Sequence, residues 1–182
     1  MIELSSLMWL TALMAAVAGY LRGWRRETPV MVAALFGAYL LIQADVLLRS
    51  IPFLTGAGRE LTFIVQIGIF GLIVYLGYGF RTAAYYQRGR RVVFKLNSAA
   101  SWLGLLFGGI NGWLIAGTAW FLMDINEYPL SPFIVAPSAT SPTALALGMN
   151  PVVLLTGGLG GGAPTFLLIA ALAALVLAAT SA

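Results

Sequence analysis

Long, nearly uncharged apolar runs decide what this chain can fold into. Four of them cover about residues 4–21, 28–48, 61–80 and 98–123, and a shorter one covers 165–182. A helix rises about 1.5 Å per residue, so about 20 apolar residues cross a hydrocarbon core of about 30 Å. Hydrophobic side chains make up 60% of the chain and charged ones only 9%, which leaves too little polar cover for a soluble domain. The runs predict an all-α integral membrane protein: a four-helix transmembrane bundle with a fifth, C-terminal transmembrane helix.

The chain changes character after the fourth run. Residues 124–164 are rich in proline and glycine, and proline lacks the N–H that continues a helix while glycine permits a hinge. We therefore expect a membrane domain over residues 1–123 and a loop outside the cytoplasm over 124–164. The prolines on which this prediction depends are Pro129, Pro132, Pro137 and Pro142.

Basic residues gather in two of the connections between runs. Arg22, Arg25 and Arg26 follow the first run, and five more follow the third: Arg81, Arg88, Arg90, Arg91 and Lys95. Short cytoplasmic loops of membrane proteins are enriched in Lys and Arg, so both connections are predicted to be cytoplasmic and the N-terminus to lie outside. The net charge of +4 is thereby explained without nucleic acid as a partner.

The second basic segment, from Arg81 to Lys95, is interleaved with aromatic and aliphatic residues. This mixture is typical of a short helix lying in the membrane interface. Each basic side chain near anionic lipid contributes about 1 kcal/mol, so lipid headgroups are the expected partner. A cytoplasmic protein partner is the alternative.

The residue types needed for most chemistry are missing. The chain has no Cys and no His, and its six acidic residues are scattered along the sequence. Thiolate and imidazole sites are therefore excluded, and carboxylates that could hold a metal do not cluster. The membrane runs also offer no pairing of nucleophile and base. We expect no catalytic residues, no metal and no cofactor.

Small residues recur at every fourth position of the fourth run: Ala100, Gly104, Gly108, Gly112 and Ala116. Four-residue steps lie on one face of a helix, where glycine lets a second backbone approach closely. The first run has a similar stripe at Thr11, Ala15, Gly19 and Gly23. Each helix is predicted to present a packing face, either within one bundle, including to the other striped helix, or to a second copy of the chain.

A few polar residues interrupt the apolar runs. Counting about 1.5 Å per residue from the predicted ends of the helices places four of them at a similar depth, namely Thr11, Gln43, Gln66 and Asn111. The leading hypothesis is one polar layer that locks the helices together by hydrogen bonds, and the alternative is a constriction for a substrate or ion. Asp45 and Arg49 are four residues apart and are expected to pair.

The first basic connection contains the most specific pattern, Gly19-x-x-Arg22-Gly23-x-x-Arg26-Glu27. Physically it predicts a tight turn between helices, with Thr28 as the N-cap of the second helix, Pro29 at its first position and Glu27 at its favourable N-terminal end. The arginines would reach lipid phosphates.

This pattern resembles the signature of the CvpA family, named for colicin V production. The segment from Leu96-Asn97 through Leu103 to Gly112 is similar to a second family stretch. The resemblance covers about residues 5–123 and departs after Asp124, where the remaining segments look like additions. It implies a bacterial inner-membrane protein without a catalytic residue set.

The family resemblance implies a role in toxin production or export, or in envelope homeostasis, as a scaffold or accessory protein with a membrane-protein partner or as a homo-oligomer. Two alternatives come from other classes: a small transporter or channel subunit, and an accessory subunit of a large respiratory or photosynthetic complex. Ion-coupled carriers usually place a charged residue near the middle of the bilayer, and the counting above places none there.

Overall fold

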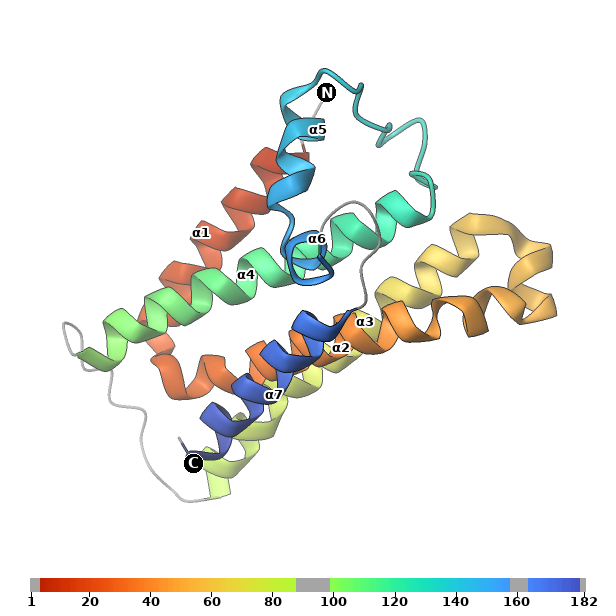
Figure 1. Ribbon diagram of the computed structural model, residues 1–182. Coiled ribbons are helices and arrows are strands. Elements are labelled where there is room, and N and C mark those ends of the chain that lie inside the picture. The colour runs from red at the N-terminus through yellow and green to blue at the C-terminus, as the bar shows by residue number, and fades with distance from the viewer. Residues whose placement is uncertain (1–3, 88–98, 158–163, 181–182) are drawn as a thin grey trace.

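The computed structural model describes residues 4–87, 99–157 and 164–180, and every element in these ranges is helical. The four long helices are α1 (Leu4–Arg22), α2 (Trp24–Ser50), α3 (Pro52–Gln87) and α4 (Ala99–Ile125) (Figure 1). Each is long and apolar enough to cross a membrane, with Gly58–Gly79 as the membrane-length part of α3. The predicted all-α architecture with four membrane-length helices is confirmed.

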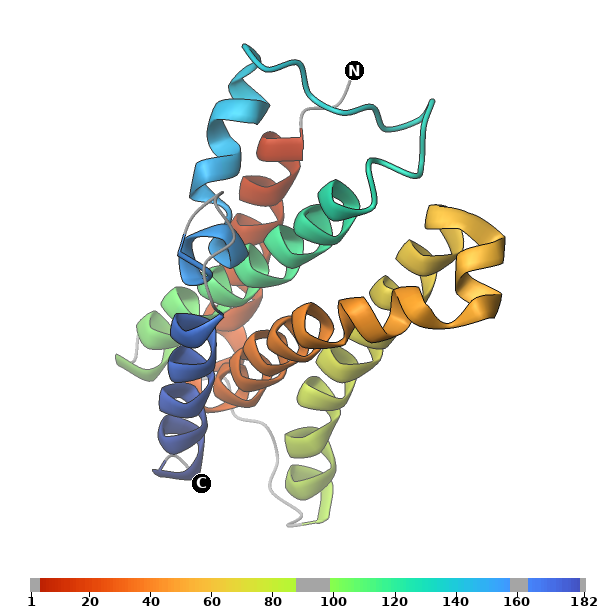
Figure 2. The same cartoon turned by 45° about the vertical axis from the view of Figure 1, so that its right-hand side comes forward.

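The long helices form two antiparallel pairs, α1 with α4 and α2 with α3 (Figures 1 and 2). In the first pair Gly19 lies against Gly104, whereas Thr11 lies against Gly112. The direction of the chain therefore reverses at each of the three connections. Gly23, at the α1–α2 turn, also lies close to Ala100 at the start of α4, so the α1–α2 turn and the start of α4 are at the same end of the molecule.

The start of α2 differs from the prediction. The helix begins at Trp24, directly after Gly23, and Pro29 lies inside it rather than at its first position. Gly23 has a φ of 79°, a left-handed conformation that costs a glycine little, and its N–H bonds back to the carbonyl of Gly19 at 2.8 Å. Thr28 is not an N-cap, because its hydroxyl donates to the Trp24 carbonyl at 2.8 Å. The chain thus turns five residues earlier than expected, at Gly23 instead of Thr28.

Helix α3 is longer than its apolar run. It begins at Pro52 and is kinked at Gly58, whose φ of 85° is not helical. At its other end the backbone stays helical through Gln87. Arg81 therefore belongs to α3 and does not begin a separate interfacial helix. The other four residues predicted to contact lipid or a partner, Arg88, Arg90, Arg91 and Lys95, lie outside the described residues.

The proline-rich segment is not all loop. Pro142 opens the short helix α5 (Pro142–Ala146), which leads into η1 (Leu147–Met149), and Pro151 opens α6 (Pro151–Leu155). Proline is tolerated at the first helical position because the N–H there has no intrahelical acceptor. Helix α7 (Thr165–Thr180) has 16 residues, about 24 Å at the standard rise. It packs along α2 (Figure 2).

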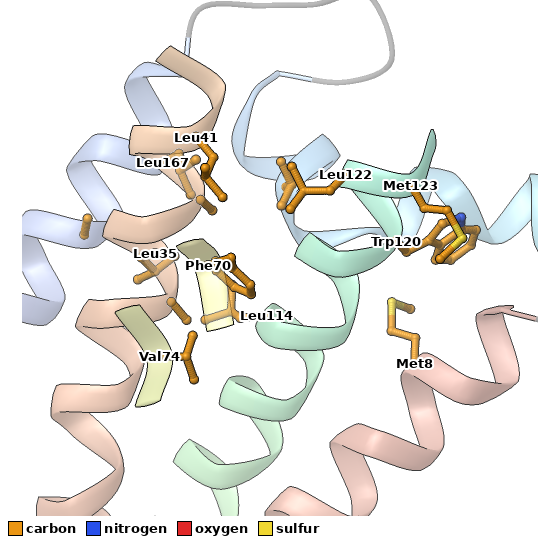
Figure 3. Close-up of a cluster of buried hydrophobic side chains, with 14 of the residues drawn as sticks. Met8, Leu35, Leu41, Phe70, Val74, Leu114, Trp120, Leu122, Met123 and Leu167 are labelled. Atoms are coloured by element: carbon orange, nitrogen blue, oxygen red, sulfur yellow. The ribbon is translucent and has the colours of Figure 1, made fainter. Parts of the chain in front are cut away.

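One apolar core lies where the two helix pairs meet. Phe70 from α3 reaches between α2 and α4 toward Leu114, and Leu122 of α4 and Leu167 of α7 close the same cluster (Figure 3). Phe70, Leu122 and Leu167 are at most 1% exposed. Many large apolar side chains on the outer faces of the long helices are exposed, for example Met14 at 66% and Leu72 at 59%. Such broad apolar surfaces are what lipid-facing helices present.

Candidate functional site

The α1–α4 contact is built from the two predicted small-residue stripes. A Cβ added at Gly19 would collide with the carbonyl oxygen of Gly104, and one at Gly108 would collide with that of Ala15. A Cβ at Gly112 would lie 2.6 Å from the Ala15 Cβ and 2.7 Å from the Thr11 carbonyl. The two backbones therefore touch along these glycines, a surface that we call the glycine seam. The two ends of the small-residue stripe on α4 contribute less to this contact, since Ala100 is exposed and Ala116 is half-buried.

Next to the glycine seam, Glu27 and Asn111 join α2 to α4. Their side chains are 1% and 0% exposed. The Asn111 Nδ2 donates to the Glu27 backbone carbonyl at 2.9 Å and to the Glu27 Oε2 at 3.0 Å. Together with two neighbours, Arg22 and Tyr78, these residues form what we call the Glu27 cluster. A carboxylate in the first turn of a helix is favoured by the partial positive charge of that end.

Arg22 closes the Glu27 cluster on its more exposed side. Its Nη1 lies 3.7 Å from the Glu27 Oε1, and its guanidinium lies 5.2 Å from the centre of the Tyr78 ring. Because the Arg22 side chain is 44% exposed, this ion pair joins a surface cation to a buried carboxyl group. Exposed ion pairs contribute at most about 1 kcal/mol to stability. Asn111 is therefore the main partner that stabilises the buried Glu27 side chain.

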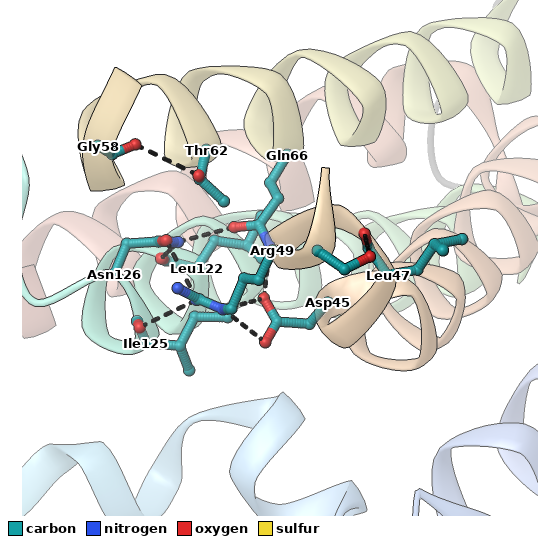
Figure 4. A network of polar contacts seen from close by, with 10 residues as sticks. Asp45, Leu47, Arg49, Gly58, Thr62, Gln66, Leu122, Ile125 and Asn126 are labelled. Carbon is teal, nitrogen blue, oxygen red and sulfur yellow. Dashed lines mark hydrogen bonds and ion pairs between the residues drawn. The ribbon is translucent and has the colours of Figure 1, made fainter. Parts of the chain in front are cut away.

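A second group, the Asp45 cluster, consists of Asp45, Arg49, Gln66 and Asn126 and ties α2, α3 and the end of α4 together (Figure 4). The Arg49 Nε donates to both Asp45 oxygens, at 3.0 and 2.8 Å, as predicted from their spacing. The Gln66 Nε2 donates to the Asp45 Oδ1 at 2.8 Å, and the Gln66 Oε1 accepts from the Asn126 Nδ2 at 2.7 Å.

The Asp45 cluster is also anchored to the end of α4. The Arg49 Nη2 donates to the Ile125 carbonyl and to the Asn126 Oδ1, both at 3.2 Å. Gln66 and Asn126 are fully buried, and their amide groups are hydrogen-bonded at both nitrogen and oxygen. Buried polar groups that are satisfied in this way fix the arrangement of helices.

The four residues of the predicted polar layer do not come together in the structure. Asn111 and Gln66 belong to different clusters, Gln43 is exposed, and the Thr11 hydroxyl donates to the Leu7 carbonyl of its own helix at 2.8 Å. Counting depth along each helix assumed that all helices begin at the same membrane surface. Because α2 begins at Trp24, its first turns lie beside the middle of α4, which brings Glu27 level with Asn111.

The positions of the sequence motif serve different purposes. Gly19 and Gly23 allow the close approach of α1 to α4, and Arg22 and Glu27 meet in the Glu27 cluster. Arg26 is half-buried. Four motif residues thus have contacts where α1, α2 and α4 come together, namely Gly19, Arg22, Gly23 and Glu27.

The sequence did not predict the roles of three residues that stabilise the end of α4, namely Trp120, Tyr128 and Asn126. The Trp120 Nε1 donates to the Tyr128 hydroxyl at 3.2 Å, and Tyr128, with a positive φ of 54°, is 6% exposed. Asn126 completes the Asp45 cluster. Its position directly after the last helical residue was the available signal, since asparagine is common where helices end.

Hollows also lie beside described helices. An apolar one of about 370 Å³ lies between α1 and α4 beside Trp9, Ala16, Leu106 and Trp113. Another, of about 420 Å³, lies between the start of α1 and residues 133–143. Within the described ranges, no three His, Cys, Asp or Glu side chains come together as metal ligands. In the Glu27 cluster, the Glu27 carboxyl group and the Tyr78 phenol are acids that can exchange a proton.

No protein-family model, no curated protein and no solved structure matches this chain.

Proposed function

We propose that this chain is a multi-pass protein of the bacterial inner membrane, similar to the CvpA family, which catalyses no reaction. It acts as a scaffold or accessory protein in colicin V-type toxin production or export, or in envelope homeostasis. One observation carries the proposal: the residues on which the family resemblance depends are used to hold helices together. Gly19 and Gly23 let α1 approach α4, while Arg22 and Glu27 meet where α2 crosses α4.

The Asp45 cluster supports the same proposal. Its side chains bond to one another and to the backbone of α4. Polar groups inside membrane proteins that only bridge helices stabilise the fold, whereas those of a transport pathway face a water-filled space. A bundle fastened at both ends suits a protein that presents its outer faces to a partner in the membrane.

A small transporter or channel subunit is the second candidate, and Glu27 favours it. A buried carboxyl group between membrane-length helices is a common feature of ion and proton pathways. The sequence placed no charged residue at such a depth, but Glu27 is 1% exposed and lies against the middle of α4.

Two measurements on the full chain test the proposal. Deleting the gene in its native host should weaken the envelope, seen as sensitivity to detergent, and the intact gene should restore resistance. The purified protein in sealed vesicles should carry no proton or ion flux above that of empty vesicles. A flux that depends on the protein favours the transporter, and subunits that co-purify in a fixed ratio favour a larger complex.

A further inference from the structure

Two oxygen atoms at the contact between α2 and α4 receive no hydrogen bond from any described protein group. They are the Glu27 Oε1 and the Asn111 Oδ1. Both belong to side chains that are almost fully buried, at 1% and 0% exposure. Buried polar atoms in folded proteins are nearly always paired, so two unpaired acceptors on adjacent groups call for a physical reason.

The other two terminal atoms of the same side chains are already joined. The Asn111 Nδ2 donates to the Glu27 Oε2 at 3.0 Å. An ionised carboxylate has only acceptors, and the amide oxygen is also an acceptor, so the remaining two oxygens cannot bond to each other. A protonated carboxyl group has one O–H donor. A proton on the Glu27 Oε1 can be donated to the Asn111 Oδ1, which closes a ring of two hydrogen bonds between acid and amide.

The charged groups around Glu27 are compatible with a neutral, protonated carboxyl group. Arg22 of α1 is the one cation within 4 Å among the described side chains, and its 3.7 Å separation from the Glu27 Oε1 is longer than a hydrogen bond. From α3 the Tyr78 phenol lies against Arg22. The first 25 residues of α4 and all of α7 contain no ionisable side chain. Preceding Glu27 on α2, Arg25 lies over the Trp24 ring and Arg26 is half-buried.

We propose that Glu27 and Asn111 form a proton-binding site that fastens α2 to α4. The bound proton, taken up from water by the carboxylate, makes Glu27 a neutral acid that donates to Asn111 and accepts from it. When the proton returns to water, the Asn111 Oδ1 loses its donor and the carboxylate is held by Arg22. This site does not depend on a role in toxin export or envelope maintenance.

The test compares the wild-type protein with Glu27→Gln and Glu27→Ala in detergent at neutral pH. Glutamine reproduces the neutral acid, since its Nε2 can donate to the Asn111 Oδ1 while its Oε1 accepts from the Asn111 Nδ2. The Glu27→Gln protein should therefore melt within about 2 °C of the wild type, and Glu27→Ala should melt about 5 °C lower. Infrared spectra should contain a protonated carboxyl band that shifts in heavy water and is absent from Glu27→Gln.

Two outcomes would overturn the proposal. One is a wild-type spectrum without that carboxyl band, which would mean an ionised carboxylate, whether held by Arg22 or bridged to Asn111 by water. The other is a Glu27→Gln protein that melts as low as Glu27→Ala, because the charge would then be what stabilises the contact. If Glu27→Ala does not fold, the spectra of the wild type and Glu27→Gln still decide.

Discussion

Gln66 shows how much of this molecule depends on single polar side chains. It donates to Asp45 and accepts from Asn126, and its own side chain is fully buried. Leucine has a similar size but would leave the Asn126 amide without that acceptor. Hydrogen bonds between membrane helices average about 0.6 kcal/mol, whereas an unsatisfied buried group costs about 1–3 kcal/mol. The cost of the unsatisfied Asn126 amide is therefore larger than the loss of the hydrogen bonds themselves.

We therefore expect Gln66→Leu to lower the free energy of unfolding in mixed micelles by about 1–3 kcal/mol. Gln43→Leu is the matched control, because Gln43 is exposed on α2. Its effect should stay within about 0.5 kcal/mol. Equal losses in the two variants would mean that the Asp45 cluster does not stabilise the helix contacts.

The Tyr128 phenol should lose its proton at an unusually high pH. Burial raises the pKa of this phenol to about 12, although the hydrogen bond from Trp120 acts in the opposite direction. Since the folded-state pKa lies above the ordinary value of 10.0, the stabilisation from neutral Tyr128 is complete below pH 10 and is lost as the pH rises toward 12.

An ultraviolet titration of tyrosinate, taken as the wild type minus Tyr128→Phe, isolates this group. The difference should contain one phenol with a midpoint near pH 12. A midpoint near pH 10 would mean that Tyr128 is open to water.

At the scale of the helices, the glycine seam is the contact most sensitive to volume. A methyl group at Gly108 would meet the Ala15 carbonyl and lie 2.9 Å from the Gly19 Cα. Both obstacles are backbone atoms, which cannot rotate away, so α1 and α4 would have to move apart. Overpacking of this kind costs about 1–3 kcal/mol.

Gly108→Ala should therefore reduce the free energy of unfolding by that amount, measured in the same micelles. Gly71→Ala in α3 is the control, because a Cβ at Gly71 has no neighbour within 4 Å. Alanine favours helix over glycine by up to about 1 kcal/mol, so this control should be neutral or stabilising. If both alanines behave alike, α1 and α4 do not touch along the seam.

The helices themselves could be predicted from sequence better than their mutual positions. Apolar length fixes where a helix crosses lipid, and the four predicted runs agree with the four long helices. The predicted start of α2 was wrong. Thr28 and Pro29 have the local pattern of a helix N-terminus, but the chain turns at Gly23, which has a left-handed backbone conformation. Because of this error of five residues, the sequence did not predict the pairing of Glu27 with Asn111. Contacts between helices depend on crossing geometry, which no single run encodes.

For the whole molecule, the alternating directions of the helices make a topological prediction. Arg25, near the α1–α2 turn, and Ala99, at the start of α4, lie at one end, while Ser138 follows the opposite end of α4, and all three are exposed. The chain has no natural cysteine, so a single introduced cysteine reports its own position.

Arg25→Cys and Ala99→Cys should react with a membrane-impermeant maleimide only after the cytoplasm is opened, because Lys and Arg concentrate on that side. Ser138→Cys should react in intact spheroplasts. Opposite behaviour of the first two variants would contradict the arrangement of the four helices.

The seam between the first and the fourth long helix also sets an order of events during synthesis. Gly104 leaves the ribosome roughly 85 residues after Gly19, about 4 to 17 s later at ordinary elongation rates. Until then the first helix must wait in the bilayer with its glycine face uncovered. A chain whose synthesis ends before the fourth helix would therefore lack the helix that packs closely against the first one. We expect quality-control proteases to remove such a chain.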